Sequence, residues 1–167
     1  MRKILFVCTG NTCRSSMAEG IFGDAVKKDT LLNGQFVAFS AGISAYDGDP
    51  ASSSSIKVMK EEWGIDICSH RARRITGNDV ETSELILAMT RSHKEAILSM
   101  FPNARHKVFT LKEFAAGVDA DRNIEEYNFA LDIMDPYGMS AHVYRRCALE
   151  IKNAVDKVIE KLKMIFK

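Results

Sequence analysis

The chain has 167 residues, of which 46% are hydrophobic and 27% are charged, a composition ordinary for one soluble globular domain with a full core. The net charge of +1 gives no bulk electrostatic reason to expect binding to nucleic acid or to a membrane surface. The first apolar run is too short for a signal peptide or a membrane span. Four cysteines are too few for a disulfide scaffold in a chain of this size, so we expect a protein of the reducing cytoplasm.

The start of the chain predicts a strand, a tight loop and a helix. Residues 3–7 form a short apolar run, and an amphipathic pattern later extends to about Lys28. Between them lies the polar sequence Cys8-Thr9-Gly10-Asn11-Thr12-Cys13-Arg14-Ser15. A loop that curls into a helix N-terminus points its backbone N–H groups inward and forms an anion site. Gly10 and Asn11 tolerate the positive φ angles that such curling requires. We therefore expect Thr9 through Ser15 to bind a phosphate group.

Cys8 and Arg14 are the residues of this loop that carry chemistry. The guanidinium of Arg14 can donate to two phosphate oxygens at once. The positive field of the loop favours the thiolate of Cys8 over the thiol, and Ser15 could donate a further hydrogen bond to the sulfur. Together these groups predict phosphoryl transfer through a cysteinyl-phosphate. The alternative is that Cys8 is only a small buried hydrophobic residue at the end of a strand.

Strands and helices alternate along the rest of the chain. Residues 36–41 are apolar on both faces, which predicts a second strand that is covered on both sides. Asp49-Pro50 is typical of a helix start and Gly64 of a helix end. The remaining expected elements are a basic loop at 66–75, a strand at 85–89, a helix from 90 to about 101, a strand at 107–110, a helical turn at 111–115, an acidic surface loop at 119–135 and a long final helix capped by Ser140.

This alternation predicts an α/β fold in which residues 1–167 form a single domain. Its four-stranded parallel sheet should carry helices on both faces. Active sites in such sheets lie at the carboxyl ends of the strands. Cys8 follows the first predicted strand directly, as this rule requires.

Asp135 is the candidate for a general acid. A leaving group expelled from phosphorus needs a proton, and Pro136 stiffens the backbone directly after Asp135, just before the final helix. The alternative is an ordinary turn, because Asp-Pro is common in turns.

The other polar candidates support the loop or lie at the surface. His70 is a candidate to orient Asn11 or Ser40 behind the loop, whereas His93, His106 and His142 are expected at the surface. No His, Cys, Asp or Glu pattern has metal-ligand spacing, so we expect no metal and no cofactor. Cys13 could trap an oxidised Cys8 as a disulfide, or it could be a small side chain that fills the junction of helix and sheet.

Phe6-Val7-Cys8-Thr9-Gly10-Asn11-Thr12-Cys13-Arg14-Ser15, followed by Met17-Ala18-Glu19, resembles the signature of the low-molecular-weight protein tyrosine phosphatases. The resemblance continues in Ser40-Ala41-Gly42, in His70-Arg71-Ala72-Arg73 and in Asp135-Pro136. It implies a Rossmann-like fold in which Cys8 is the nucleophile, Arg14 the phosphate clamp and Ser15 the thiolate stabiliser. It also implies that Asp135 is the general acid and then base, and that Asn11, Ser40 and His70 form a supporting network. The chain departs from the family at Ser16, where proline is usual.

Thr12 and Tyr137 bear on the substrate. Thr12 stands where the tyrosine phosphatases usually carry Ile or Leu, and it resembles the bacterial protein-arginine phosphatases of the same family. Asp135-Pro136-Tyr137-Gly138, with one aromatic residue before glycine, resembles that branch too. A hydroxyl suits a polar guanidinium or an attacking water, whereas a branched alkyl group suits a phenyl ring.

The resemblance therefore predicts a cysteine-dependent phosphatase that acts on phosphoarginine in proteins. The nearest alternative is a protein tyrosine phosphatase with the same mechanism. An arsenate reductase on the same fold would need resolving cysteines, and Cys68 and Cys147 are not an obvious pair. A non-enzymatic oxyanion-binding or redox-sensing module would keep the loop without needing Asp135.

Overall fold

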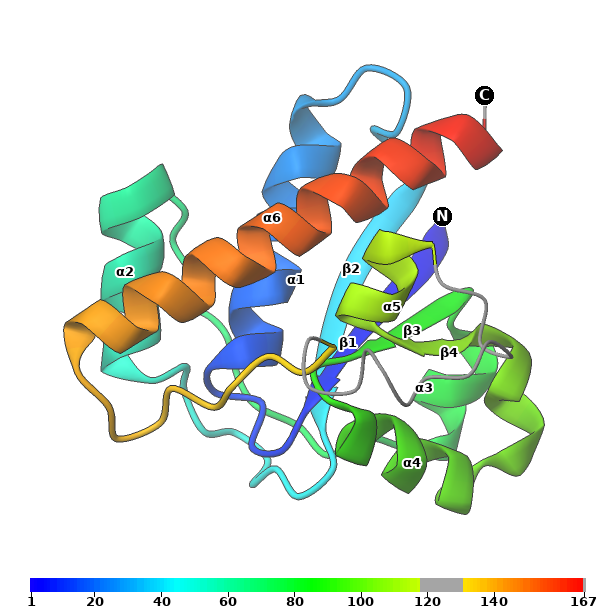
Figure 1. Ribbon diagram of the computed structural model, residues 1–167, viewed down its shortest axis with the longest axis horizontal. Coiled ribbons are helices and arrows are strands. Elements are labelled where there is room, and N and C mark those ends of the chain that lie inside the picture. Colours follow the sequence, from blue (N-terminus) through cyan, green and yellow to red (C-terminus); the bar gives the residue numbers. More distant parts are fainter. Residues whose placement is uncertain (118–130, 167) are drawn as a thin grey trace.

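A parallel four-stranded sheet lies at the centre of the computed structural model, which describes residues 1–117 and 131–166 (Figure 1). Its strands are β1 (Arg2–Cys8), β2 (Phe36–Gly42), β3 (Leu85–Ala88) and β4 (Val108–Thr110), in the order β2-β1-β3-β4. The central strand β1 pairs with both β2 and β3, so that Cys8 lies opposite Gly42 and Val7 opposite Ala88. This arrangement confirms the predicted α/β fold and brings the carboxyl ends of the three strands to one edge.

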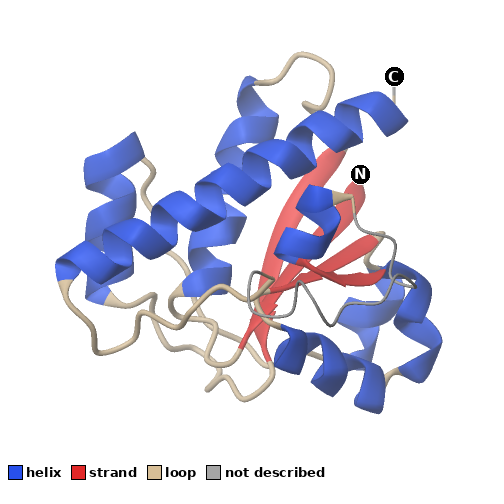
Figure 2. Ribbon diagram, viewed as in Figure 1, coloured by secondary structure: helices blue, strands red, loops and turns tan. Residues whose placement is uncertain are grey.

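Helices cover both faces of the sheet (Figure 2). Ile4 and Phe6 of β1 belong to one hydrophobic core, and Leu5 and Val7 belong to the other, because successive side chains of a strand point to opposite faces. The first core is closed by α1 (Arg14–Lys28), α2 (Ser53–Trp63), α5 (Leu111–Ala116) and α6 (Ala141–Ile165). The second is closed by α3 (Gly77–Thr82), α4 (Arg91–Met100) and the 3-10 helix η1 (Pro102–Lys107).

The strand β2 is only partly covered, so the prediction that it is covered on both sides holds only in part. Phe39 lies opposite Leu5 in the pairing with β1 and is 36% exposed. The reason is the position of β2 at the edge of the sheet, since the core on that face takes only Ala41 from β2 and its other strand residues from β1, β3 and β4. An apolar run in the sequence does not distinguish a central strand from an edge strand.

The helix α2 begins later than Asp49-Pro50 predicts. Its N-cap is Ser52, whose side chain accepts a hydrogen bond from the backbone of Ser55. Pro50 instead forms an isolated bridge with Arg71, and the carbonyl of Asp49 accepts from the N–H of Ala72. Pairing with a distant segment therefore overrides the local helix signal. Gly64 ends α2 with φ 66°, as predicted.

Other helix boundaries follow local capping signals. Ser140 caps α6 and Thr90 caps α4, each by accepting from the backbone N–H three residues later. The short helix α3 has no counterpart in the sequence prediction, although Thr76 and Asp79 form a capping box at its start. Of the predicted acidic loop, residues 119–130 lie outside the described residues. None of the helices in the described ranges is both long enough and apolar enough to cross a membrane.

Candidate active site

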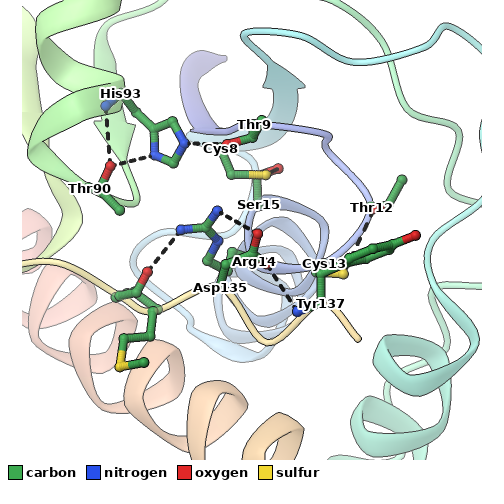
Figure 3. Close-up of polar contacts among 12 residues, drawn as sticks. Cys8, Thr9, Thr12, Cys13, Arg14, Ser15, Thr90, His93, Asp135 and Tyr137 are labelled. Carbon is green, nitrogen blue, oxygen red and sulfur yellow. Dashed lines mark hydrogen bonds and ion pairs between the residues drawn. The ribbon is translucent and has the colours of Figure 1, made fainter. Parts of the chain in front are cut away.

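The loop between β1 and α1 wraps around the sulfur of Cys8 (Figure 3). The backbone N–H of Asn11 donates to Cys8 Sγ at 3.3 Å, and Ser15 Oγ lies 2.9 Å from the same sulfur. Asn11 has the left-handed φ of 57° that the curl requires, whereas Gly10 does not have a positive φ. The prediction of a left-handed residue therefore holds for Asn11 and is wrong for Gly10.

The side chain of Asn11 holds the loop together from inside. It is fully buried, and its Nδ2 donates to Ser15 Oγ at 2.8 Å and to Ser40 Oγ at 2.9 Å. Its Oδ1 accepts from the backbone N–H of Arg73 at 3.1 Å. One amide thus orients the hydroxyl beside the sulfur and ties the loop to β2 and to the 66–75 segment.

His70 completes this network together with a residue that the sequence prediction missed. His70 Nε2 lies 2.7 Å from the carbonyl oxygen of Asn11, and its Nδ1 lies 3.7 Å from the carboxylate of Glu19. The same carboxylate accepts a hydrogen bond from Ser40 Oγ. Glu19 lies on α1 within the Met17-Ala18-Glu19 stretch. The signal that could have identified it is its place in the chain directly after the loop.

Gly42 permits the close approach of the loop to β2. A Cβ atom on this glycine would lie 2.4 Å from the carbonyl oxygen of Thr9, which is too close for any side chain. The two residues after it, Ile43 and Ser44, donate their N–H groups to the carbonyls of Cys8 and Thr9 at 2.9 and 3.0 Å. The first part of the loop is therefore held along its backbone by the segment after β2.

Arg14 connects the loop to the segment that carries Asp135. The buried guanidinium donates from Nη1 to the carbonyl oxygen of Ile133 at 2.9 Å, and its Nη2 lies 3.5 Å from Asp135 Oδ2. Ile133 in turn donates its N–H to the carbonyl of Met89, the residue directly after β3. The structure thus brings Asp135 to the loop, where 53% of its side chain stays open to solvent.

A second carboxylate and a turn fix the same segment. Asp132 Oδ1 accepts from the backbone N–H of Arg91, the first residue of α4, at 2.8 Å. Asp135 Oδ1 accepts from the backbone N–H of Tyr137 at 3.1 Å, which sets the orientation of the carboxyl group. The ring of Tyr137 is exposed, and Thr12 is half-buried.

The sequence prediction is wrong about the location of His93. It was expected at the surface, but it is only 8% exposed and belongs to the site. Its Nε2 lies 2.8 Å from Thr9 Oγ1, and its Nδ1 lies 2.9 Å from Thr90 Oγ1. Burial and, second, the charge of Arg14 lower the pKa of His93 to about 4. The signal that could have indicated this is that His93 lies in the first turn of the helix that follows β3, and β3 ends beside the carboxyl end of β1.

Cys13 points into a junction of helices. Its sulfur lies 3.3 Å from Ser52 Oγ and 3.4 Å from the hydroxyl of Tyr144. Burial and the hydrogen bond with Cys13 raise the pKa of Tyr144 to about 12, so this hydroxyl stays protonated. These contacts agree with the alternative of a small buried side chain, although the junction lies between helices and not between helix and sheet. Disulfide formation with Cys8 stays a prediction.

The remaining cysteines and histidines lie apart from this constellation. Cys68 is exposed, and Cys147 is buried on α6, where burial raises the pKa of its thiol to about 12. His106 and His142 are exposed, as predicted. In residues 1–117 and 131–166, no three His, Cys, Asp or Glu side chains are grouped as metal ligands would be.

Comparisons with known proteins agree with this geometry. Residues 3–165 match the family described as low molecular weight phosphotyrosine protein phosphatase. A protein-arginine-phosphatase from Geobacillus stearothermophilus is 39% identical over 160 residues, which are 96% of this chain and 95% of that protein. The crystal structure of a low molecular weight protein tyrosine phosphatase from T. tengcongensis superimposes with a TM-score of 0.84 at 44% identity, covering 96% of this chain and 99% of the other. The YwlE arginine phosphatase from Geobacillus stearothermophilus superimposes with a TM-score of 0.83 at 37% identity, covering 99% and 95%. The chain belongs to the low molecular weight phosphotyrosine protein phosphatase family.

Proposed function

We propose that this protein is a cysteine-dependent protein phosphatase that hydrolyses phosphoarginine in proteins. The observation that carries the proposal is the convergence of three groups from two distant segments. The Cys8 sulfur receives hydrogen bonds inside an anion-binding loop, and Arg14 of that loop lies 3.5 Å from Asp135. This is the set of groups that cysteine-mediated phosphoryl transfer requires.

In the first step the Cys8 thiolate attacks phosphorus while the P–N bond breaks. The bonding electron pair passes to the guanidinium nitrogen, which takes a proton from Asp135. The backbone N–H groups of the loop and the guanidinium of Arg14 stabilise the negative charge that spreads over the phosphoryl oxygens. The dephosphorylated protein leaves, and the phosphoryl group remains on sulfur.

In the second step water attacks the cysteinyl-phosphate. Asp135, now ionised, removes a proton from this water, and the S–P bond breaks with its electron pair going to sulfur. The hydroxyl of Ser15, which lies 2.9 Å from Sγ, stabilises the departing thiolate. Inorganic phosphate is released. Asp135 is then protonated and Cys8 is a thiolate, as before the first step.

The arginine preference rests on Thr12 and on the relatives. Thr12 Oγ1 lies 3.8 Å from Cys13 Sγ, at the long limit of a hydrogen bond to sulfur, so its hydroxyl can still bind a polar group. Two of the relatives reported above are named arginine phosphatases. A reducing cytoplasm is the compartment we propose, because the mechanism needs Cys8 as a free thiolate.

A protein tyrosine phosphatase is the second candidate. It is favoured by the 44% identity to the tyrosine phosphatase of T. tengcongensis. The exposed ring of Tyr137 could also pack against a phenyl group. An arsenate reductase is not supported, because Cys147 is a buried thiol with a raised pKa and is a poor resolving nucleophile.

The test compares phosphoarginine and phosphotyrosine peptides of one sequence as substrates. We expect the wild type to have the higher kcat/KM for phosphoarginine. Thr12→Val keeps the shape and removes the hydroxyl, so it should lose about tenfold on phosphoarginine, the value of one hydrogen bond, and little on phosphotyrosine. Thr12→Ile should shift the preference further towards phosphotyrosine.

Cys8→Ser serves as the inactive control, since the hydroxyl is a far weaker nucleophile than the thiolate. The same ratio of the two kcat/KM values in wild type and in both Thr12 variants would remove the case for arginine. Release of phosphate from either peptide would exclude a purely oxyanion-binding module. Full activity of Cys8→Ser would contradict the mechanism.

A further inference from the structure

We propose that His93 is a positioning residue of this active site, which holds the Thr9 side chain and with it the first turn of the phosphate-binding loop against α4 (Figure 3). The inference rests on the phosphatase function proposed above and extends it to a residue outside the loop. It assigns a task to a buried imidazole that takes no part in the two chemical steps.

The imidazole is itself held firmly by the start of α4. Thr90, the N-cap of this helix, accepts the backbone N–H of His93 at 3.2 Å. The same hydroxyl lies 2.9 Å from His93 Nδ1. The orientation of the ring is therefore fixed from within its own helix, and Nε2 is presented to Thr9 at 2.8 Å.

Thr9 needs such a partner because little else holds its side chain. It follows the nucleophile directly and is exposed, so apolar packing does not fix its rotamer. Its carbonyl is bound by the N–H of Ser44 at 3.0 Å on the β2 side of the loop. His93 binds its hydroxyl from the β3 side. The residue after Cys8 is thus held from two sides, by one backbone and one side-chain hydrogen bond.

A neutral ring suits this task. The lowered pKa of His93 keeps the ring uncharged near neutral pH, with one N–H donor and one acceptor. With the proton on Nε2, the Thr90 hydroxyl donates to Nδ1 and the ring donates to Thr9 Oγ1. The Thr9 hydroxyl then accepts from the ring and keeps its own proton free to donate.

Two substitutions separate the contacts of the ring. His93→Gln can place an amide N–H near the position of Nε2, whereas His93→Asn reaches only the position of Nδ1. We expect His93→Asn to lose about tenfold in kcat/KM on the phosphoarginine peptide, as misplaced catalytic groups do. We expect His93→Gln to restore activity to within about threefold of wild type. His106→Gln, at an exposed histidine, is the matched control and should be unchanged.

Two readouts measure the loop without turnover. One is the inhibition constant of inorganic phosphate, and the other is the rate at which iodoacetate alkylates Cys8, followed by mass spectrometry of that peptide. In His93→Asn the inhibition constant should rise and the alkylation rate should fall, because the anion site is distorted. Thr9→Val removes the other partner without touching α4, and it should show the same loss.

The double variant Thr9→Val with His93→Asn should lose no more than either single variant, because both remove one contact. Additive losses, equal losses in His93→Gln and His93→Asn, or wild-type behaviour of Thr9→Val would each overturn the inference. If the wild type hydrolyses neither peptide, the proposed function fails. The phosphate and alkylation readouts still decide the role of His93 in that case.

Discussion

Asn11 combines two properties that a substitution can separate, a left-handed backbone and a buried hydrogen-bonding side chain. If it is needed only for its φ of 57°, glycine should replace it at a loss of no more than about 1 kcal/mol. If its amide is what matters, both Asn11→Gly and Asn11→Ala should be strongly destabilised. The structure supports the second case, because the side chain makes hydrogen bonds to Ser15, Ser40 and the backbone of Arg73.

The size of the effect follows from these three contacts. Each buried hydrogen bond contributes about 1 kcal/mol net, so both variants lose about 3 kcal/mol from this source. Alanine adds about 1 kcal/mol for the left-handed conformation. Glycine adds a similar amount, about 0.5–1 kcal/mol, through its larger freedom in the unfolded chain. We therefore expect both variants to lose about 4 kcal/mol and to differ by less than about 1 kcal/mol.

Urea unfolding followed by circular dichroism measures these free energies. Asn103→Ala, at an exposed asparagine of η1, is the matched control and should stay within about 0.5 kcal/mol of wild type. An Asn11→Gly variant that loses no more than about 1 kcal/mol would show that the loop needs only the backbone conformation. The reasoning from the amide network would then be refuted.

Two further predictions concern the Asp132–Asp135 segment and the pH dependence of stability. Asp135→Ala should lower kcat by about a hundredfold, the usual contribution of a general acid. Asp132→Ala should lower kcat by about tenfold, because it releases the segment that carries Asp135 from α4. Steady-state kinetics measure both effects, and the same kcat in wild type and both variants would contradict both roles. The pKa of His93 falls from 6.5 to about 4 on folding, so the unfolded chain binds more protons between these values and stability is lost as pH falls below 6.5. Between pH 7 and pH 5 the wild type should lose about 2 kcal/mol of unfolding free energy that His93→Gln retains. Urea titrations of both proteins at the two pH values measure this difference. Equal losses in wild type and variant would show that His93 has the same pKa in the folded and the unfolded state.

Much of the site could be predicted because its groups lie close together in the chain. Cys8, Asn11 and Ser15 meet through a loop of a few residues that runs from a strand into a helix, and the structure shows their contacts. Capping by Ser140 and termination at Gly64 depend on one turn of backbone, and both predictions hold. Local hydrogen bonding therefore makes these features readable from residue type and spacing.

Other features depend on which segments meet in space. Pro50 forms a bridge with Arg71 instead of starting a helix, and Phe39 is exposed because β2 lies at the edge of the sheet. His93 looked like one of several surface histidines, because nothing beside it in the chain indicates that Thr9 will lie 2.8 Å away.

The sequence by itself thus determined the loop around Cys8, which is the proposed nucleophile, and the alternation of strands and helices. Each of these is encoded within a few consecutive residues. Only the tertiary structure decided that β3 would lie beside β1, and it therefore placed the first turn of α4 against Thr9 and the Asp132–Asp135 segment against Arg14. The physical reason is that strand order depends on burying two apolar faces at once, which no local pattern specifies.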